Sequence, residues 1–351
     1  MEPVRLGVVG CGVIGRKHLD VAARAAQVEV VAVADIDEAA ACAVAAQCGV
    51  ETIYADADML LADPRVEGVV LAFPTKGRTQ VALRAFARGK HVLLEKPVAM
   101  NAEEVRWMLA AKGELVAACC SSRLRFLPSA DVATEVIAGG ALGDIRVVRC
   151  RAIIPADGPP ETPRPPWRLR RDLNGGGILV NWGCYDLDYL LGITGWALRP
   201  RCVLAQTWPI PPQFASHVPP GSDAETHYAA LVRFERGAVL TIERGEYMPA
   251  AREEAWQVIG SKGSLRLQMT PGQGKQIWLD EATADRGMVT RVIWQGDEDG
   301  DTQHAGPILD FASAIRGGHP PKTGLEQALV VQQITDAVYA SAEHGRAVKI
   351  E

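Results

Sequence analysis

Apolar stretches alternate with amphipathic stretches through the first third of the chain. The apolar ones, such as VRLGVVG, VEVVAVADI, VEGVVLAF, KHVLLEK and ELVAACC, are almost continuous in Val, Ile and Leu. The stretches between them, such as GVIGRKHLDVAARAAQ and DEAAACAVAAQCG, have the spacing of helices. Strands that lack a polar face are buried on both sides, which is typical of a parallel sheet covered by helices. The pattern therefore predicts a doubly wound parallel sheet of the Rossmann type over residues 1–121.

The pattern changes from about Ser122 onward. After a helix, a strand and a long Pro- and Gly-rich loop, the stretch AETHYAALVRFERGAVLTIERGEY alternates with period two about an Arg236-Gly237 turn. This pattern predicts an antiparallel hairpin with one buried face, and AWQVIGSKGSLRLQM predicts two further strands. We expect residues 122–351 to form an α+β domain with an open, mainly antiparallel sheet and helices on one face. The free face of such a sheet suits pairing of subunits.

The stretch GGGILVNWGCYDLDY, at 175–189, has three glycines followed by apolar residues at helical spacing. At 100° per residue, Asn181, Tyr185 and Asp188 gather within about 60° on the side opposite the apolar positions. The apolar side is formed by Leu179, Val180, Leu187, Leu190 and Leu191. Two interpretations stay open: a solvated outer face, or a face that meets a substrate.

Composition narrows the class of protein. The chain has 351 residues, 48% hydrophobic and 23% charged, which suits a globular protein of two domains. Its net charge of −5 disfavours nucleic-acid binding. The longest apolar runs are too short to span a membrane, and the amino terminus leads directly into a predicted strand, so we expect neither a membrane span nor a signal peptide. Eight cysteines without a C-x-x-C pair indicate free thiols and a cytoplasmic protein. Because no ligand spacing is found, we expect no metal.

The turn GCGVIG follows the first predicted strand and opens the first helix. In this pattern Gly10 permits a tight turn, Gly12 lets the backbone approach a pyrophosphate, and Gly15 lets the helix pack close to the strand. Asp35 ends the second strand, where a carboxylate accepts hydrogen bonds from the adenosine ribose and repels a 2′-phosphate. The pattern predicts a dinucleotide site that prefers NAD to NADP. The alternative for Asp35 is a plain strand-end cap.

With these motifs and Glu95-Lys96-Pro97 in place, the chain resembles the glucose–fructose oxidoreductase / inositol dehydrogenase / rhizopine-catabolism family almost from end to end, including its carboxy-terminal helices. The resemblance implies that the proline lies in a cis bond or sharp turn, and that Lys96 reaches the substrate beside the nicotinamide. We therefore also expect cofactor contacts from Val13, Ile14, Pro74, Thr75, Glu95 and Lys96.

The chain departs from the family at the glycine-rich helix. The family pattern is G-G-G-x-x-x-D-x-G-x-H-x-x-D, and here Asn181 replaces the Asp and Tyr185 replaces the His, while Asp188 is kept. Some members of the family carry Tyr at this position. A tyrosine titrates near 10, but a cation such as Lys96 within about 4–6 Å favours the phenolate. We therefore predict Lys96 and Tyr185 as the proton-transfer pair, with Asn181 and Asp188 orienting neighbouring hydroxyls. The alternative for Tyr185 is an aromatic wall against a sugar ring.

The loop PRPPWRLRRDLN precedes this helix and is rich in arginine. Guanidinium groups suit carboxylate, sulfonate or phosphate, and Trp167 could stack on a pyranose. We therefore expect Arg123, Trp167 and Arg168 to bind substrate, in a basic pocket that could also include Arg78, Arg125, Arg164, Arg170 and Arg171. The alternative is a solvated basic loop that makes salt bridges.

Together these features predict an NAD-dependent oxidoreductase that transfers hydride between nicotinamide and a hydroxyl-bearing carbon of a sugar, sugar acid or cyclitol, with anionic substrates included. We expect a homodimer or homotetramer. One alternative is an NAD-dependent glycoside hydrolase acting by transient C3 oxidation and elimination. The other is a non-catalytic cofactor-sensing regulator, which the retention of Glu95-Lys96-Pro97 disfavours.

Overall fold

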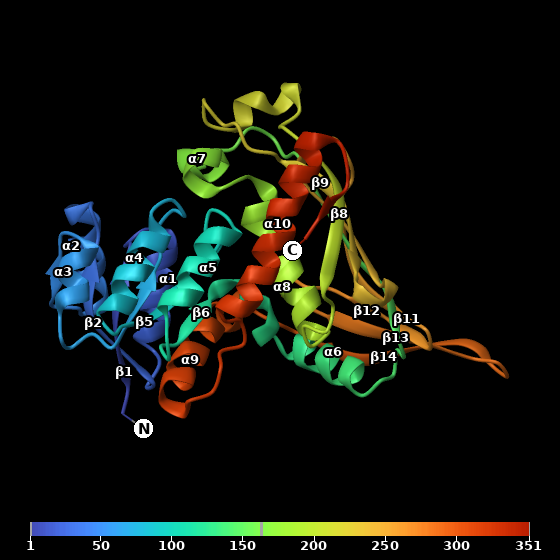
Figure 1. The fold of residues 1–351 in the computed structure, drawn as a ribbon, viewed down its shortest axis with the longest axis horizontal. Helices are drawn as coiled ribbons and strands as arrows, with labels where there is room; N and C mark the ends of the chain where they lie inside the picture. The colour runs from blue at the N-terminus through green and yellow to red at the C-terminus, as the bar shows by residue number, and fades with distance from the viewer. Residues whose placement is uncertain (1, 162–163, 351) are drawn as a thin grey trace. The chain divides into compact units, whose positions relative to one another are not determined.

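The computed structural model describes residues 2–161 and 164–350 (Figure 1). The chain divides into two compact units, Met1–Arg123 with Asp301–Leu329, and Leu124–Gly300 with Val330–Glu351. The segment Asp301–Leu329, which the sequence analysis assigned to the second domain, is part of the first compact unit.

The sheet of the first unit is entirely parallel, as predicted. Its strand order is β3-β2-β1-β4-β5-β6. The strands are β1 (Val4–Val9), β2 (Val28–Ala34), β3 (Ile53–Tyr54), β4 (Gly68–Leu71), β5 (His91–Leu94) and β6 (Ala117–Cys119). The pattern missed β3, because a strand of two residues cannot show a hydrophobic period.

Successive residues of these strands enter two different hydrophobic clusters, which shows that both faces of the sheet are buried. Val69 and Leu71 pack in one cluster, while Val70 packs in the other. The second cluster also contains Ile308 and Phe311, and this packing explains why the late segment belongs to the first unit. The helices of this unit are α1 (Val13–Ala22), α2 (Glu38–Cys48), α3 (Ala57–Ala62), α4 (Arg78–Ala87), α5 (Ala102–Ala111) and, apart from its first residue, α9 (Gly300–Gly317).

Side-chain caps fix where three of these helices begin. The carboxylate of Asp37 accepts the Ala40 N–H at 3.1 Å, and Asp56 and Asn101 cap α3 and α5 in the same manner. Such a cap satisfies a backbone N–H that the first turn of a helix leaves without a partner.

The second unit contains a nine-stranded sheet of order β14-β13-β12-β11-β7-β10-β9-β8-β15. Its neighbours pair antiparallel except for β7 and β10, so the predicted mainly antiparallel sheet is confirmed. The strands are β7 (Ile145–Pro155), β8 (Pro200–Trp208), β9 (His227–Phe234), β10 (Val239–Met248), β11 (Glu253–Gly260), β12 (Gly263–Leu267), β13 (Lys275–Thr283), β14 (Gly287–Gly296) and β15 (Val348–Lys349).

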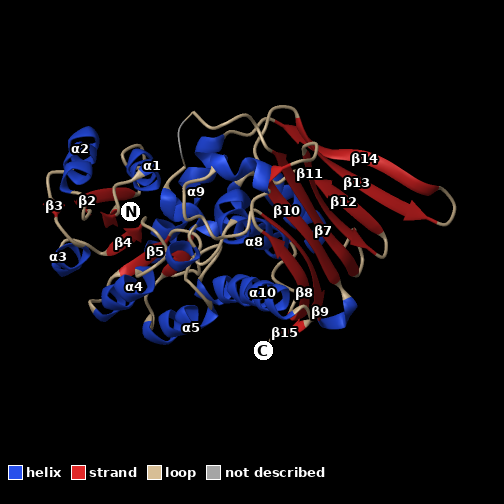
Figure 2. Cartoon of the chain, turned by 90° about the horizontal axis from the view of Figure 1, so that it is seen from above, coloured by secondary structure: helices blue, strands red, loops and turns tan. Residues whose placement is uncertain are grey.

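The predicted hairpin is β9 and β10, and Arg236 and Gly237 at its turn both have positive φ, 62° and 86°. Figure 2 shows α8 (Cys184–Ile193) and α10 (Leu325–His344) on one face of this sheet. The other helices of the unit are α6 (Pro128–Ala138) and the short α7 (Arg171–Asn174). None of the helices in the described part of the chain has the length and hydropathy needed to cross a membrane.

Candidate active site

The glycine turn between β1 and α1 leaves space at the start of the helix. A Cβ on Gly10 would lie 2.5 Å from the carbonyl oxygen of Ala72, and one on Gly15 would lie 1.9 Å from the carbonyl oxygen of Gly10. These two glycines are therefore required by the packing of the chain itself. A Cβ on Gly12, in contrast, would meet nothing within 4 Å. The open space lies at a helix amino terminus, where backbone N–H groups bind phosphate, so the turn fits a dinucleotide.

Asp35 lies beside this turn, at the carboxyl end of β2. Its Oδ2 accepts the Cys11 N–H at 2.6 Å, and its Oδ1 accepts the Asp37 N–H at 2.9 Å. Each carboxylate oxygen can accept a further hydrogen bond, so Asp35 can bind ribose hydroxyls while it keeps these two backbone contacts. The apolar side chains of Val13 and Ile36, which flank Gly12 and Asp35 in the sequence, are 85% and 95% exposed.

The other predicted cofactor residues follow neighbouring strands. Pro74 and Thr75 come after β4, and Glu95 and Lys96 come after β5. Because the carboxyl ends of parallel strands share one edge of the sheet, these residues lie along the same edge as the glycine turn. Ile14 differs, since it packs against the hydrophobic core of the unit.

The Glu95-Lys96-Pro97 turn is held by a buried hydrogen-bond network. The peptide bond between Lys96 and Pro97 is cis. The Glu95 carboxylate accepts the Lys96 N–H at 3.0 Å, His18 Nε2 lies at 2.8 Å, and Arg123 Nη2 donates at 2.7 Å. Burial would raise the pKa of Glu95, but the charge of Arg123 and the contact with His18 outweigh it and hold that pKa well below its usual range.

Arg78 supports the same turn from α4. Its guanidinium donates to the backbone carbonyls of Glu95, Pro97 and Phe73. Burial among these carbonyls lowers the pKa of Arg78 to about 10. Arg78 is thus a buried support of the lysine turn and does not line a basic pocket.

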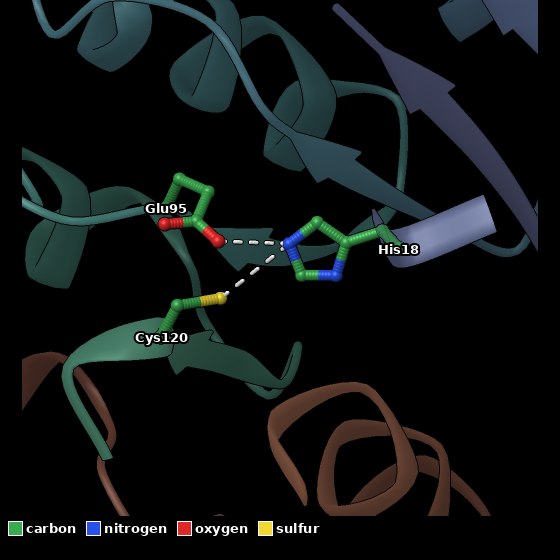
Figure 3. A group of neighbouring side chains, drawn as sticks. All are labelled: His18, Glu95 and Cys120. Carbon is green, nitrogen blue, oxygen red and sulfur yellow. Dashed lines mark hydrogen bonds and ion pairs between the residues drawn. The ribbon is translucent and has the colours of Figure 1, made fainter. Parts of the chain in front are cut away.

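His18, Glu95 and Cys120 come together in Figure 3, although they are far apart in the sequence. Their nitrogen, oxygen and sulfur atoms lie within 4.8 Å of one another, which is close enough to consider a metal ion. Two observations disfavour one. The 2.8 Å between His18 and Glu95 is a hydrogen-bond distance, and Arg123 binds the same Glu95 oxygen. In addition, burial raises the pKa of the Cys120 thiol well above its ordinary value. The group fits a hydrogen-bond network better than a cation site.

The alternative of a solvated outer face on the glycine-rich helix does not fit the structure. Residues Leu179–Gly183 form a π-helical turn that runs directly into α8, and the wider turn breaks the 100° spacing behind that prediction. Tyr185 is only 5% exposed, and Asp188 is fully buried. Asn181 is partly exposed. Asp188 binds Arg125 at 2.7 Å, so it faces the core of its unit.

The glycines that open this helix are explained by what packs against them. A Cβ on Gly176 would lie 1.8 Å from the hydroxyl oxygen of Tyr339, and one on Gly177 would lie 1.8 Å from the carbonyl oxygen of Glu225. The Glu225 carboxylate accepts the Gly177 N–H at 3.0 Å, the Leu179 N–H at 3.1 Å and the Tyr339 hydroxyl at 2.9 Å. It therefore caps the helix, and its burial raises its pKa.

A second buried carboxylate lies next to Tyr185 in the sequence. Asp186 accepts hydrogen bonds from Arg244 at 2.5 and 2.9 Å and from the Trp256 indole at 2.9 Å. Arg244 also lies 5.1 Å from the ring centre of Trp182, whose ring meets that of Tyr185 edge-on at 5.6 Å. On its own unit, Tyr185 thus packs against a ring that lies beside the buried Asp186–Arg244 pair.

The arginines of the predicted basic pocket already have partners. Arg168 binds both oxygens of Glu246, at 2.9 and 2.8 Å, and Arg164 approaches the same carboxylate at 3.8 Å. Arg170 pairs with Asp172 at 3.1 Å and Arg171 with Glu225 at 3.9 Å. This arrangement differs from the predicted anion pocket, because these guanidinium groups already lie beside carboxylates, of which Glu246 and Glu225 are buried and Asp172 is exposed.

Trp167 is 38% exposed. Of this loop the structure describes the residues from Arg164 onward, and Pro163 lies outside the described residues. Sequence reasoning missed His18, Glu225 and the pairing of Asp186 with Arg244. The one signal for His18 is its place one helical turn after Gly15, on the helix that the glycine turn opens.

Comparison with known proteins places both units in one family. The model described as "Oxidoreductase family, NAD-binding Rossmann fold" matches residues 4–119, and the model described as "GFO/IDH/MocA C-terminal domain" matches residues 131–266. The chain belongs to the GFO/IDH/MocA family of oxidoreductases. The resemblance found in the sequence is thereby confirmed.

Three members of the GFO/IDH/MocA family give a scale for the likeness. The chain is 26% identical to a D-xylose 1-dehydrogenase (NADP(+)) of Haloferax volcanii, covering 98% of this chain and 99% of the relative. It is 24% identical to the D-glucoside 3-dehydrogenase of Escherichia coli, covering 99% and 98%. A solved oxidoreductase domain protein from Kribbella flavida matches the fold with a TM-score of 0.86 at 23% identity, over 100% of both chains.

Substitution distinguishes a glycine that leaves space for the cofactor, Gly12, from a glycine required by packing, Gly176. Gly12→Ala should leave the free energy of unfolding of the cofactor-free protein unchanged within about 0.5 kcal/mol, but should weaken NAD binding because the methyl group enters the phosphate space. Gly176→Ala should instead cost about 1–3 kcal/mol of stability, because the methyl group overlaps the Tyr339 hydroxyl. Denaturant unfolding and calorimetric titration with NAD measure both effects. Unchanged NAD affinity in Gly12→Ala would contradict the assignment.

Proposed function

We propose that this protein is an NAD-dependent dehydrogenase that acts on a hydroxyl-bearing carbon of a neutral sugar or cyclitol. The observation that carries the proposal is the buried network that holds Lys96 at the same sheet edge as the open cradle at Gly12. A lysine fixed there has a defined place beside the nicotinamide end of a bound dinucleotide.

In this proposal Lys96 and Tyr185 handle the proton of the substrate hydroxyl. Bound NAD supplies a hydride acceptor at its nicotinamide C4. Tyr185 takes the hydroxyl proton as the carbon–hydrogen bond breaks, and the Lys96 ammonium stabilises the negative charge on the substrate oxygen and on the phenolate. Burial and the edge-on ring of Trp182 limit the motion of the Tyr185 ring. In the reverse direction, the same phenol returns the proton.

The remaining side chains are divided between binding and support. Asn181, which is partly exposed, is proposed to orient a neighbouring hydroxyl, and Trp167 to cover the apolar face of a ring. Asp188 is assigned to support, because it is fully buried and paired with Arg125. Arg123 and Arg168, also buried and paired, support the site in the same sense.

A neutral substrate follows from the same charge balance. A bound carboxylate or phosphate would have to compete with Glu246 or Glu95 for a guanidinium that each already binds at hydrogen-bond distance. The names of the D-xylose and D-glucoside dehydrogenases above point to substrates of the neutral class. We therefore favour sugars and cyclitols over sugar acids.

The proposed preference for NAD rests on Asp35. Its charge at the end of β2 opposes a 2′-phosphate, whereas its free acceptor capacity suits ribose hydroxyls. The Haloferax volcanii relative is named for NADP(+), so the preference has to be established for each member of the family. We also infer a reducing compartment, the cytoplasm, which the eight free cysteines support.

Asp35→Ala should reverse the cofactor preference. We expect the dissociation constant for NAD to rise about 10- to 100-fold, because hydrogen bonds from a charged acceptor to the ribose are lost. Binding of NADP should change less or improve, since the repelling charge is removed. Fluorescence titration with both reduced cofactors measures the two constants, and Asp37→Ala on the same exposed turn is the control. Equal losses for both cofactors would mean that Asp35 is only a strand-end brace.

Tyr185→Phe should separate acid–base chemistry from packing. The ring is kept and the titratable oxygen is removed, so turnover of a polyol should fall about 10²–10⁴-fold while NAD affinity changes little. Formation of NADH is followed at about 340 nm with a panel of neutral sugars and cyclitols. Tyr185→His should restore part of the rate with a lower pH optimum, since His titrates nearer neutrality.

Full activity of Tyr185→Phe would contradict the acid–base role and favour a stacking wall. The same panel includes aryl glycosides. Aglycone release without accumulation of NADH would favour the glycoside hydrolase alternative over the dehydrogenase.

We further propose that two copies pair through the outer face of the nine-stranded sheet. Leu204 and Leu231 are 51% and 38% exposed there, on the adjacent strands β8 and β9. They line a shallow depression of about 670 Å³ together with Ala229, Thr241 and Glu243. Exposed leucines on adjacent strands of a sheet face suit a self-complementary interface.

A charge on this face should prevent pairing. Leu231→Glu should convert the oligomer to a smaller species in sedimentation velocity, because burying an unpaired carboxylate costs several kcal/mol. Val289→Glu, on the exposed β14, is the matched control and should leave the mass unchanged. An unchanged mass in Leu231→Glu, or a monomeric wild type, would contradict the proposed interface.

A further inference from the structure

We propose that His18 is a positioning residue for Lys96, acting through Glu95. This inference rests on the proposed role of Lys96 in the reaction. His18 lies on α1, the helix that begins at the glycine turn, and its ring is 2% exposed. The side chain is thus out of reach of a substrate, and whatever it does for the reaction must pass through a neighbour.

That neighbour is the Glu95 carboxylate. His18 Nε2 lies 2.8 Å from one Glu95 oxygen, and the other oxygen accepts the Lys96 N–H at 3.0 Å. Two consecutive hydrogen bonds therefore connect α1 to the backbone of the lysine. The chain from His18 to Lys96 is buried up to the lysine itself, which is partly exposed.

The second ring nitrogen indicates which nitrogen donates. His18 Nδ1 is buried without a hydrogen-bond partner. A proton there would be a buried donor left unsatisfied, whereas a bare nitrogen costs less. Nε2–H is therefore assigned as the donor to Glu95.

Because Arg123 also binds Glu95, the effect of His18 on the orientation of the carboxylate can be considered apart from the charge of the carboxylate. Arg123 donates to the same Glu95 oxygen at 2.7 Å and supplies the positive charge that keeps the carboxylate ionised. Without His18, Glu95 would stay ionised but would lose one of the two side-chain bonds that hold this oxygen in place. Loss of His18 should therefore displace Lys96 while leaving the charge of the network intact.

The location of His18 on α1 connects the glycine turn to the lysine turn. The amino terminus of this helix opens at Gly12, where the dinucleotide phosphates are expected, and His18 lies further along the same rigid element. One helix thus sets both the position of the cofactor and, through Glu95, the position of the lysine that acts beside it. Turnover depends on the relative position of the cofactor and the lysine, since a displacement of about 1 Å between reacting groups can lower the rate about 10²-fold.

The test compares His18→Gln, His18→Asn and His18→Leu. A glutamine amide places an N–H near the position of Nε2, an asparagine amide falls short of it, and leucine offers no donor. We expect His18→Leu and His18→Asn to lower kcat about 10- to 100-fold with NAD affinity within about twofold of wild type, and His18→Gln to retain most of kcat. Leu19→Ala, on the same helix and 1% exposed, should lower the melting temperature while keeping kcat.

A second measurement does not depend on activity. The rate at which acetic anhydride acylates Lys96 is followed by peptide mass spectrometry, with the exposed Lys262 as internal reference. Lys96 should be acylated faster in His18→Leu than in the wild type, because the Glu95-Lys96-Pro97 turn is held less firmly without the His18 contact. In His18→Gln the rate should match that of the wild type. If no polyol is oxidised by the wild type, the proposed function fails, but this rate still reports on the positioning of Lys96.

Two results would overturn the inference. One is an unchanged Lys96 acylation rate in His18→Leu. The other is a loss of kcat in Leu19→Ala as large as that in His18→Leu, which would reduce the effect of His18 to general stability.

Discussion

The candidate site depends on a carboxylate that has no access to water. Glu95 is 3% exposed, and an ionised group at such a position is stable only with charges and donors around it. The chain meets this requirement with His18, Arg123 and the Lys96 N–H, which come from three separate segments. The need to satisfy one buried charge therefore determines how the first helix, the end of β5 and the segment after β6 come together.

In the second unit, too, buried carboxylates are stabilised by donors from separate segments. Glu225 is fully buried and gathers two N–H groups of the glycine-rich helix together with the Tyr339 hydroxyl. Asp186 does the same with Arg244 and Trp256. These polar residues thus serve the internal structure, and Arg168 is better described as a counter-ion of the buried Glu246 than as a receptor for an anion.

The features that could be predicted from the sequence are those marked by a local hydrophobic period or a turn residue. Continuous apolar strands indicated the parallel sheet, and period-two alternation with a glycine at the turn indicated the β9–β10 hairpin. The glycine turn, Asp35 and the lysine motif lie at one sheet edge because strand order alone brings them there.

What escaped prediction depended on contacts over long sequence distances. No period reveals that Phe311 packs beneath the first sheet, or that Arg168 meets Glu246. The helical wheel drawn for this segment failed because a π-helical turn lies between Asn181 and Tyr185 and because every residue of α8, including Tyr185 and Asp188, is buried. The strand β14 is almost wholly exposed, so it lacks the apolar alternation by which strands are recognised.

The place of Tyr339 near the end of the chain bears on how the protein is made. During synthesis the glycine-rich helix leaves the ribosome long before the residue whose hydroxyl packs against Gly176 and binds Glu225. The same holds for Ile308 and Phe311, which complete the core of the first unit. Although domains often fold as they emerge, here the Glu225 network of the second unit and the core of the first unit are completed only by the carboxy-terminal helices. A chain cut short before them would leave the ribosome with the buried Glu225 carboxylate lacking the Tyr339 hydroxyl.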